Sequence, residues 1–269
     1  MNSDRDYRFD SNKEMLGYDL MKSYPNISCF STTRHGGCSE GNYASFNCTW
    51  YCGDTEEHVQ QNLAHLCTLL TQRPVRLLIP HQTHSCCVKV VDAFTLQEDM
   101  EGVDAIITRQ PGCCLCISTA DCIPLLLYDR LHGVVAAVHA GWRGTVGRIV
   151  EKCIETMAQN FGTVGKDIVA CIGPGISLDA FEVGDEVYQA FAEAGFDMER
   201  IARKEEKWHL DLWEANRIQL LSKGVPTSQI EVAGICTYTH VEDFFSARRL
   251  GIQSGRILTG IMIHQTEKK

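Results

Sequence analysis

Two histidines and one cysteine in this sequence have side chains that could together hold a metal ion. Each of the three, His84, Cys122 and His139, lies at the end of an apolar run of strand-like composition. The intervals between them along the chain are too long for a zinc finger or a zinc ribbon, in which ligands come in closely spaced pairs. A site made of these side chains must therefore be assembled by the tertiary fold.

Two imidazoles and one thiolate form a donor set that suits Zn²⁺, and three protein ligands leave a fourth position for water or substrate. This arrangement is typical of a catalytic zinc rather than a structural one. His81 is an alternative to His84 as the first ligand, because it lies three residues earlier in the same cluster. Asp121, beside Cys122, could orient a ligand imidazole or accept a proton.

Strands and helices alternate in the elements that would position these residues. Short apolar runs rich in β-branched residues and bounded by Gly, Pro or Asp predict buried strands. Asp54 as N-cap and Glu57 resemble a capping box that begins a helix. The expected strands are 27–31, 77–80, 87–91, 105–108, 113–117, 125–128, 134–138, 168–172, 208–210, 230–235 and 257–263, and further helices are expected over 148–161, about 182–194 and 211–223.

This interleaving predicts an α/β or α+β architecture, with mixed β-sheets covered by helices. With 269 residues, 44% of them hydrophobic, the chain can bury a large core, and we expect a polar segment over residues 1–20 followed by a single domain over 21–269. The net charge of −9 argues against nucleic acid as a partner, since proteins that bind it usually carry a basic face.

Fourteen cysteines raise the question of disulfides. The sequence starts with polar residues and not with an apolar signal segment, and no apolar run reaches the length of a membrane span. We therefore expect a cytoplasmic protein with no membrane partner, in a reducing compartment where nearly all the thiols are structural.

Two stretches around the candidate ligands resemble the signature segments of a known family. They are TADCIPLLLYD (119–129) and AAVHAGWRGT (136–145), and they are similar to segments of the laccase-domain family, whose members were once called multicopper polyphenol oxidases and are now regarded as zinc-dependent purine nucleoside enzymes. The resemblance continues in family order over about residues 27–263. Its other blocks are FSTTRHGG (30–37), GD (53–54), IGPGI (172–176), FEVG (181–184), HLDL (209–212) and FFSARR (244–249).

The resemblance implies a zinc site made by His84, Cys122 and His139. It also implies purine nucleosides and inorganic phosphate as partners: deamination of adenosine, and phosphorolysis of adenosine, inosine, guanosine and methylthioadenosine. Residues expected to bind substrate are Arg34, Arg143, Glu182 and Arg249, and Asp121 or Glu182 could move the proton in deamination. Ala247 stands where family members commonly have Tyr, which removes any stacking that the Tyr ring would supply.

Three other functions remain open from the sequence. Copper at the same three ligands could support a weak polyphenol oxidase, because copper outcompetes zinc at most nitrogen and sulfur sites. Cys122 could instead be a nucleophile activated by His139 in a hydrolase without metal. A protein that is not an enzyme, with these side chains serving only as packing, would bind no metal and turn over no nucleoside.

Overall fold

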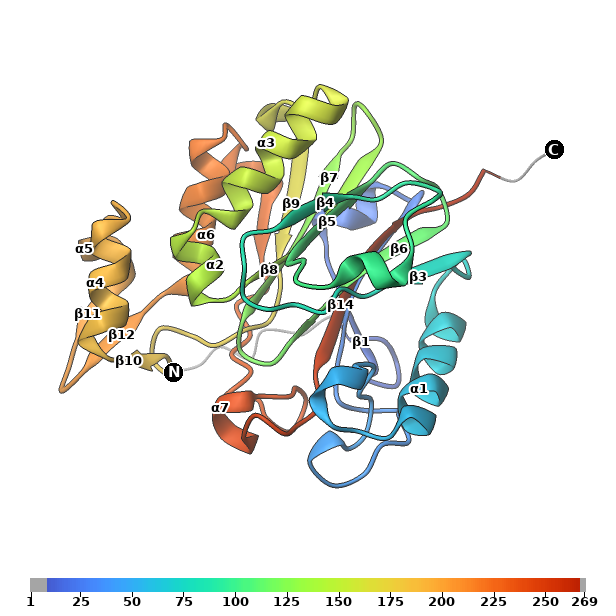
Figure 1. The fold of residues 1–269 in the computed structure, drawn as a ribbon, viewed down its shortest axis with the longest axis horizontal. Coiled ribbons are helices and arrows are strands. Elements are labelled where there is room, and N and C mark those ends of the chain that lie inside the picture. Colours follow the sequence, from blue (N-terminus) through green and yellow to red (C-terminus); the bar gives the residue numbers. More distant parts are fainter. Residues whose placement is uncertain (1–8, 267–269) are drawn as a thin grey trace.

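A six-stranded mixed sheet forms the centre of the fold in the computed structural model, which describes residues 9–266 (Figure 1). Strands β7 and β8 lie in its middle and are buried along their whole length. The order is β13-β9-β7-β8-β5-β4, with β4 Val88–Val90, β5 Ala105–Thr108, β7 Ile123–Asp129, β8 Val134–Ala140, β9 Ile168–Ile172 and β13 Ile230–Val232.

A five-stranded sheet packs against one face of the central sheet. Its central strand β14 runs antiparallel to both of its neighbours, β2 and β6. The order is β1-β2-β14-β6-β3, with β1 Met15–Gly17, β2 Ile27–Thr32, β3 Arg76–Leu78, β6 Cys113–Thr119 and β14 Ile257–Ile263.

Alternating residues of the same strands fill separate hydrophobic layers, as the two-residue period of a strand requires. On β7, Leu125 and Leu127 face the helices, whereas Leu126 faces the five-stranded sheet. On β6, Leu115 packs between the two sheets and Cys114 faces the opposite layer, which contains Leu66 of a helix. The result is a helix layer, two sheets and a second helix layer.

Helices close both outer faces (Figure 1). Helix α1 (Glu56–Leu69) covers the five-stranded sheet, and α3 (Ile149–Phe161) and α6 (Leu212–Ser222) cover the six-stranded one. A three-stranded sheet with α4 and α5 extends this second layer. The remaining elements are β10 Glu182–Val183, β11 Ala202–Lys204, β12 Trp208–Leu210, α2 Trp142–Val146, α4 Asp185–Glu193, α5 Met198–Ile201, α7 Ala247–Leu250, and the 3₁₀ turns Leu20–Ser23, Gly41–Tyr43, Trp50–Cys52, Gln97–Met100, Gly165–Asp167 and Thr227–Gln229.

The predicted fold class, mixed sheets covered by helices, is confirmed. The predicted cap of the first helix is wrong: Thr55 is the N-cap, with its hydroxyl accepting from the His58 backbone N–H. Asp54 is instead bonded to the hydroxyl of Ser39 and the amide of Asn47, so its carboxylate anchors the preceding loop.

The N-terminal segment 1–20 is described only in part: residues 1–8 lie outside the described residues, and Met15–Gly17 pairs with β2. Over residues 9–266, none of the helices is both long and apolar enough for a membrane span.

Candidate metal centre

The chain brings the three predicted ligands together where it passes between the two large sheets. His84 lies on the connection from β3 to β4, which belong to different sheets. Cys122 lies in the turn from β6 to β7, a second passage from one sheet to the other. His139 is the last residue but one of β8. It lies on the same side of the strand as Val135 and Ala137, the side that faces the five-stranded sheet. The ligand atoms of the three side chains all lie within 4.8 Å of one another.

The distance between two of these atoms is close to that of two ligands on a tetrahedral zinc ion. Zn–S and Zn–N bonds of the usual length place sulfur and nitrogen ligands about 3.5 Å apart, and the Cys122 Sγ to His84 Nε2 distance is 3.7 Å. The rings of His84 and His139 are close to perpendicular, at 78°, with centroids 4.9 Å apart. His139 is buried, Cys122 half-buried and His84 exposed, so the site is open on one side, as a catalytic metal requires.

Asp104, just before β5, organises two of the ligands. Its carboxylate accepts from Nδ1 of His139 at 2.7 Å, which leaves Nε2 of that ring for a metal. It also accepts from the backbone N–H groups of Thr83, His84 and Ser85 and from the Ser85 hydroxyl. Burial by itself raises the pKa of Asp104, but these donors, above all the His139 ring, bring the pKa below its ordinary value. A fully buried carboxylate with five donors therefore holds the His84 turn and the His139 ring together.

Both ligand-bearing turns contain a residue in the left-handed backbone region. His84 itself has φ +61° and Asp121 has φ +90°. Non-glycine residues adopt such angles at a cost on the order of 1 kcal/mol, and they do so mostly where surrounding contacts fix them. Here the contacts are the three N–H bonds to Asp104 in one turn and the carboxylate bonds of Asp121 in the other.

The carboxylate of Asp121 is bonded to groups other than the imidazoles. It accepts from the hydroxyl of Thr237 at 2.7 Å and from the backbone N–H of Arg248 at 2.7 Å. These bonds tie the turn that carries Cys122 to helix α7. The orienting bond that we considered for Asp121 is made by Asp104, which the sequence analysis did not place among the site residues.

Cys122 and His139 form a charged pair in the metal-free protein. Burial opposes ionisation of both groups, but each stabilises the other's charge. The His139 charge, with hydrogen bonds from both histidines, lowers the pKa of the Cys122 thiol to about 6. The Cys122 thiolate and the Asp104 carboxylate raise the pKa of His139 to about 9. Binding of a metal would displace the proton of His139 while Cys122 is already ionised near neutral pH.

We expect iodoacetamide to alkylate Cys122 of the metal-free protein several-fold faster at pH 7 than the more exposed Cys38, whose pKa is raised by burial and by neighbouring carboxylates. Labelling of Cys122 should slow about tenfold between pH 7 and pH 5, because the thiolate is protonated as the pH falls through 6. Bound zinc should protect Cys122 and leave Cys38 unaffected. Peptide mapping by mass spectrometry measures both rates, and equal labelling with and without zinc would contradict the assignment of Cys122 as a ligand.

Gly141 has no room for a side chain beside the ligands. A Cβ there would lie 2.8 Å from His84 Cδ2 and 3.0 Å from Cys122 Sγ, although its φ of −70° suits any residue. We expect Gly141→Ala to weaken zinc binding about tenfold by displacing ligand side chains, with little change in the thermal unfolding temperature of the metal-free protein. Gly17→Ala, where a Cβ meets nothing within 4 Å, is the control for competition titrations with a chromophoric chelator. Unchanged affinity in Gly141→Ala would show that the ligands are free to shift.

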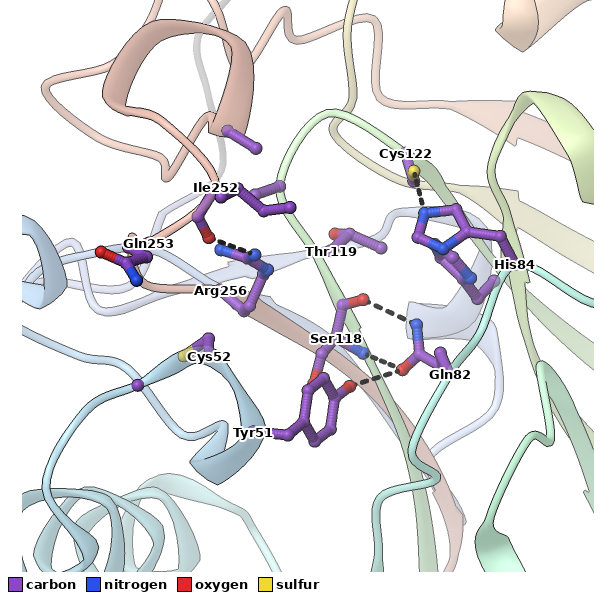
Figure 2. A pocket seen from close by; sticks show the side chains of 14 residues that line it. Tyr51, Cys52, Gln82, His84, Ser118, Thr119, Cys122, Ile252, Gln253 and Arg256 are labelled. Atoms are coloured by element: carbon purple, nitrogen blue, oxygen red, sulfur yellow. Dashed lines mark hydrogen bonds between the residues drawn. The ribbon is translucent and has the colours of Figure 1, made fainter.

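A cavity of about 590 Å³ adjoins the three ligands (Figure 2). Tyr51, from the turn Trp50–Cys52, donates its hydroxyl to Oε1 of Gln82, and Gln82 also makes two bonds to the backbone of Ser118. Burial raises the pKa of Tyr51 to about 12, so this hydroxyl stays a donor at neutral pH. Arg256, which the sequence analysis missed, also lines the cavity, and in Figure 2 it lies on the side away from Cys122 and His84.

The four residues expected to bind substrate or move a proton are not among those that line this cavity. Arg34 donates to the carbonyls of Ala44 and Val241. Arg143 and Arg249 are exposed, with their guanidinium groups over the rings of Trp142 and Tyr238. Glu182 is bonded to Lys207 beside the three-stranded sheet, and Lys207 lowers the pKa of Glu182.

His81, the alternative to His84 as metal ligand, is paired with Glu101 at 2.8 Å.

Comparison with known proteins identifies the family. Residues 28–264 match the family described as multi-copper polyphenol oxidoreductase laccase. The chain belongs to this laccase-domain family. A protein of Bacteroides thetaiotaomicron named purine nucleoside phosphorylase is 60% identical to it over 94% of this chain and 97% of that protein.

Other members of the laccase-domain family extend the similarity. A protein named adenosine deaminase RL5, from an unknown prokaryotic organism, is 42% identical over 92% of this chain and 98% of that protein. The crystal structure of the Bacillus licheniformis hypothetical protein YfiH superimposes with a TM-score of 0.88 at 28% identity, covering 94% of this chain and 97% of that one. The laccase-domain fold therefore spans nearly the whole chain.

Proposed function

We propose that this chain is a zinc-dependent purine nucleoside phosphorylase that also deaminates adenosine. The observation that carries the proposal is the convergence of His84, Cys122 and His139 at an open cavity. The two similar proteins named purine nucleoside phosphorylase and adenosine deaminase give the substrate class. Adenosine, inosine, guanosine and methylthioadenosine are the substrates that we propose, with inorganic phosphate as co-substrate.

In this proposal the three ligands hold the ion and the rest of the site positions the nucleoside. Zinc, when bound, supplies a Lewis acid that lowers the pKa of water toward neutrality. Tyr51 offers a protonated hydroxyl, and Gln82 is fixed by Ser118, so these residues present polar groups of constant orientation to a purine or a ribose. Asp121 acts indirectly, by holding the Cys122 turn through Thr237.

The arrangement accommodates two reactions because they place different demands on the protein. Deamination requires activated water at the purine ring and no second substrate. Phosphorolysis requires a phosphate held beside C1′ while negative charge develops on the departing purine. A cavity of about 590 Å³ lies within the range that ligand pockets usually have, so a nucleoside would fit with space for an anion.

Incubation of zinc-loaded protein with adenosine, with and without phosphate, tests the proposal directly. Chromatography should show inosine in both samples, and adenine with ribose 1-phosphate only where phosphate is present. Absence of all these products from metal-loaded protein would refute the function. We place the enzyme in the cytoplasm, a proposal supported by the fourteen cysteines, all of which are free thiols.

Copper chemistry is the alternative that the family description favours. The same donors would accept copper, but in residues 9–266 a single group of three potential ligands meets the spacing that one ion needs. A multicopper oxidase needs several copper ions. Metal analysis of protein produced without added copper separates the two functions, and we expect about one zinc per chain. The oxidase would be favoured if a copper-loaded, zinc-free protein oxidised a phenol and did not turn over nucleosides.

A further inference from the structure

Arg256 is held rigidly at the wall of the cavity by backbone carbonyl groups. Its Nη1 donates to the carbonyls of Ser254 at 2.6 Å and Gly255 at 3.0 Å, and its Nη2 donates to Ile252 at 2.9 Å. Its own backbone N–H donates to Oδ1 of Asn47. Because these bonds fix both the side chain and the start of β14, the guanidinium keeps one orientation without a ligand.

The positive charge of Arg256 has no carboxylate partner among the described residues. The described residues that line the cavity include no Asp or Glu, and Arg256 is the one Arg or Lys among them. The protein as a whole has a net charge of −9, so this cavity presents a positive charge within an acidic protein. Such a group favours the binding of an anion.

Part of the guanidinium fork remains free. An arginine has five N–H groups; here Nη1 donates to the Ser254 and Gly255 carbonyls and at 3.4 Å to the Ser254 hydroxyl, and Nη2 donates to the Ile252 carbonyl. Within residues 9–266 no acceptor is bonded to Nε or to the second hydrogen of Nη2. Two N–H groups on adjacent nitrogens can bind two oxygens of a phosphate group.

Thr119 adds a polar group to the same wall. It lies at the end of β6, three residues before Cys122, and it lines the cavity. Its hydroxyl oxygen is buried and has no hydrogen-bond partner in the described part of the chain. In Figure 2 Thr119 is drawn between Arg256 and Cys122. A buried hydroxyl without a partner is uncommon in folded proteins, and a ligand's oxygen would satisfy it.

We propose that Arg256 is the residue that binds inorganic phosphate for phosphorolysis, with Thr119 as a further donor. This inference rests on the proposed function and refines it. An oxygen of HPO₄²⁻ bonds to C1′, the C1′–N9 bond breaks with its electron pair going to the purine, and the hydrogen of HPO₄²⁻ ends on the purine. The products are ribose 1-phosphate and the free base. Arg256 stabilises the phosphate throughout, and deamination does not require it.

The decisive variant is Arg256→Gln, which removes the charge and the fork but keeps a polar side chain. Charge-assisted bonds of this kind correspond to about a 10- to 100-fold effect. We expect the KM for phosphate in phosphorolysis to rise by that factor, while kcat/KM for deamination of adenosine changes less than about threefold. Arg256→Lys, which retains the charge without the fork, should show an intermediate KM.

Arg76→Gln is the matched control. Like Arg256, Arg76 is half-buried, donates to backbone carbonyls and has no carboxylate partner among the described residues. Its acceptors are the carbonyls of Asp92 and Thr95, and it lies outside the cavity. We expect this variant to lose a similar amount of thermal stability and to keep the phosphate KM of the wild type. An equal rise of KM in both variants would overturn the proposal.

Calorimetric titration of metal-free protein with inorganic phosphate separates the anion site from catalysis. Wild type and Arg76→Gln should bind phosphate, and Arg256→Gln should bind it at least about tenfold more weakly. If wild type binds phosphate through Arg256 but yields no nucleoside products, the proposed function fails and the anion site stands. If Arg256→Gln phosphorolyses normally or binds phosphate as wild type does, the proposal fails. It also fails if only adenosine 5′-monophosphate, and not inorganic phosphate, binds in an Arg256-dependent way.

Discussion

We expect Cys122→Ala to retain no tightly bound zinc and to lose both nucleoside activities by about a thousandfold. The variant reduces the ligand set to two imidazoles, one of them on the exposed side of the site. It is preferable to His139→Ala, which would leave the buried carboxylate of Asp104 without its ring partner and would destabilise the fold. Cys122 is half-buried in a turn, so its replacement by alanine should change the unfolding temperature of metal-free protein little.

Cys153→Ala is the control for this experiment. Cys153 is a fully buried thiol on α3, in the core layer between helices and sheet, and burial raises its pKa to about 12. We expect this variant to keep one zinc per chain, by elemental analysis, and most of its activity. Full activity in Cys122→Ala would show that the chemistry occurs elsewhere.

Asp104→Asn should weaken zinc binding by about 10- to 100-fold. Asp104 does not bond to the atoms that would bind zinc; it bonds to Nδ1 of His139, and Nε2 of that ring is the ligand atom. One carboxylate oxygen accepts from His84 N–H and the His139 ring, and the other accepts from Thr83 and Ser85. Either orientation of an asparagine amide would place its NH₂ group against donors. The His84 turn and the His139 ring should therefore both lose their fixed positions.

The matched control is Asp129→Asn. Asp129 is also a fully buried aspartate that accepts from a histidine ring, that of His132, and from two backbone N–H groups, but it lies at the far end of β7 from Cys122. Both variants should lower the unfolding temperature, and only Asp104→Asn should lower zinc affinity in a competition titration. Equal zinc affinities in the two variants would show that Asp104 serves stability alone.

Much of the fold could be predicted because the strands are short apolar runs with clear boundaries. The runs at 113–117, 125–128 and 134–138 became strands of seven residues each, because sheet pairing continues into the residues that flank them. The assignment of strands to two sheets could not be predicted, since strands buried on both faces give no alternation of polar and apolar residues. The helix expected from about residue 182 begins at Asp185, because Glu182 and Val183 pair with β12.

The three ligands could be found from residue types and family segments, but their supporting residues could not. Asp104 has the sequence context of an ordinary turn, and its role follows from three peptide groups that come close only in the fold. Arg256 belongs to none of the sequence motifs that we identified. It directly precedes a buried strand, and a charged residue at the end of such a strand is the one feature of the sequence that indicates a site there. Arg34 was an attractive candidate beside two glycines, but it is not among the residues that line the cavity beside the three ligands.

Two of the ligands lie on connections between the two large sheets, and the third lies on a strand of the central sheet. An ion bound there would fasten layers that are otherwise joined by packing and by chain connections. Its binding free energy would then add to the free energy of unfolding of the two-sheet core. Loss of the ion would thus lower the stability of the fold as well as the activity.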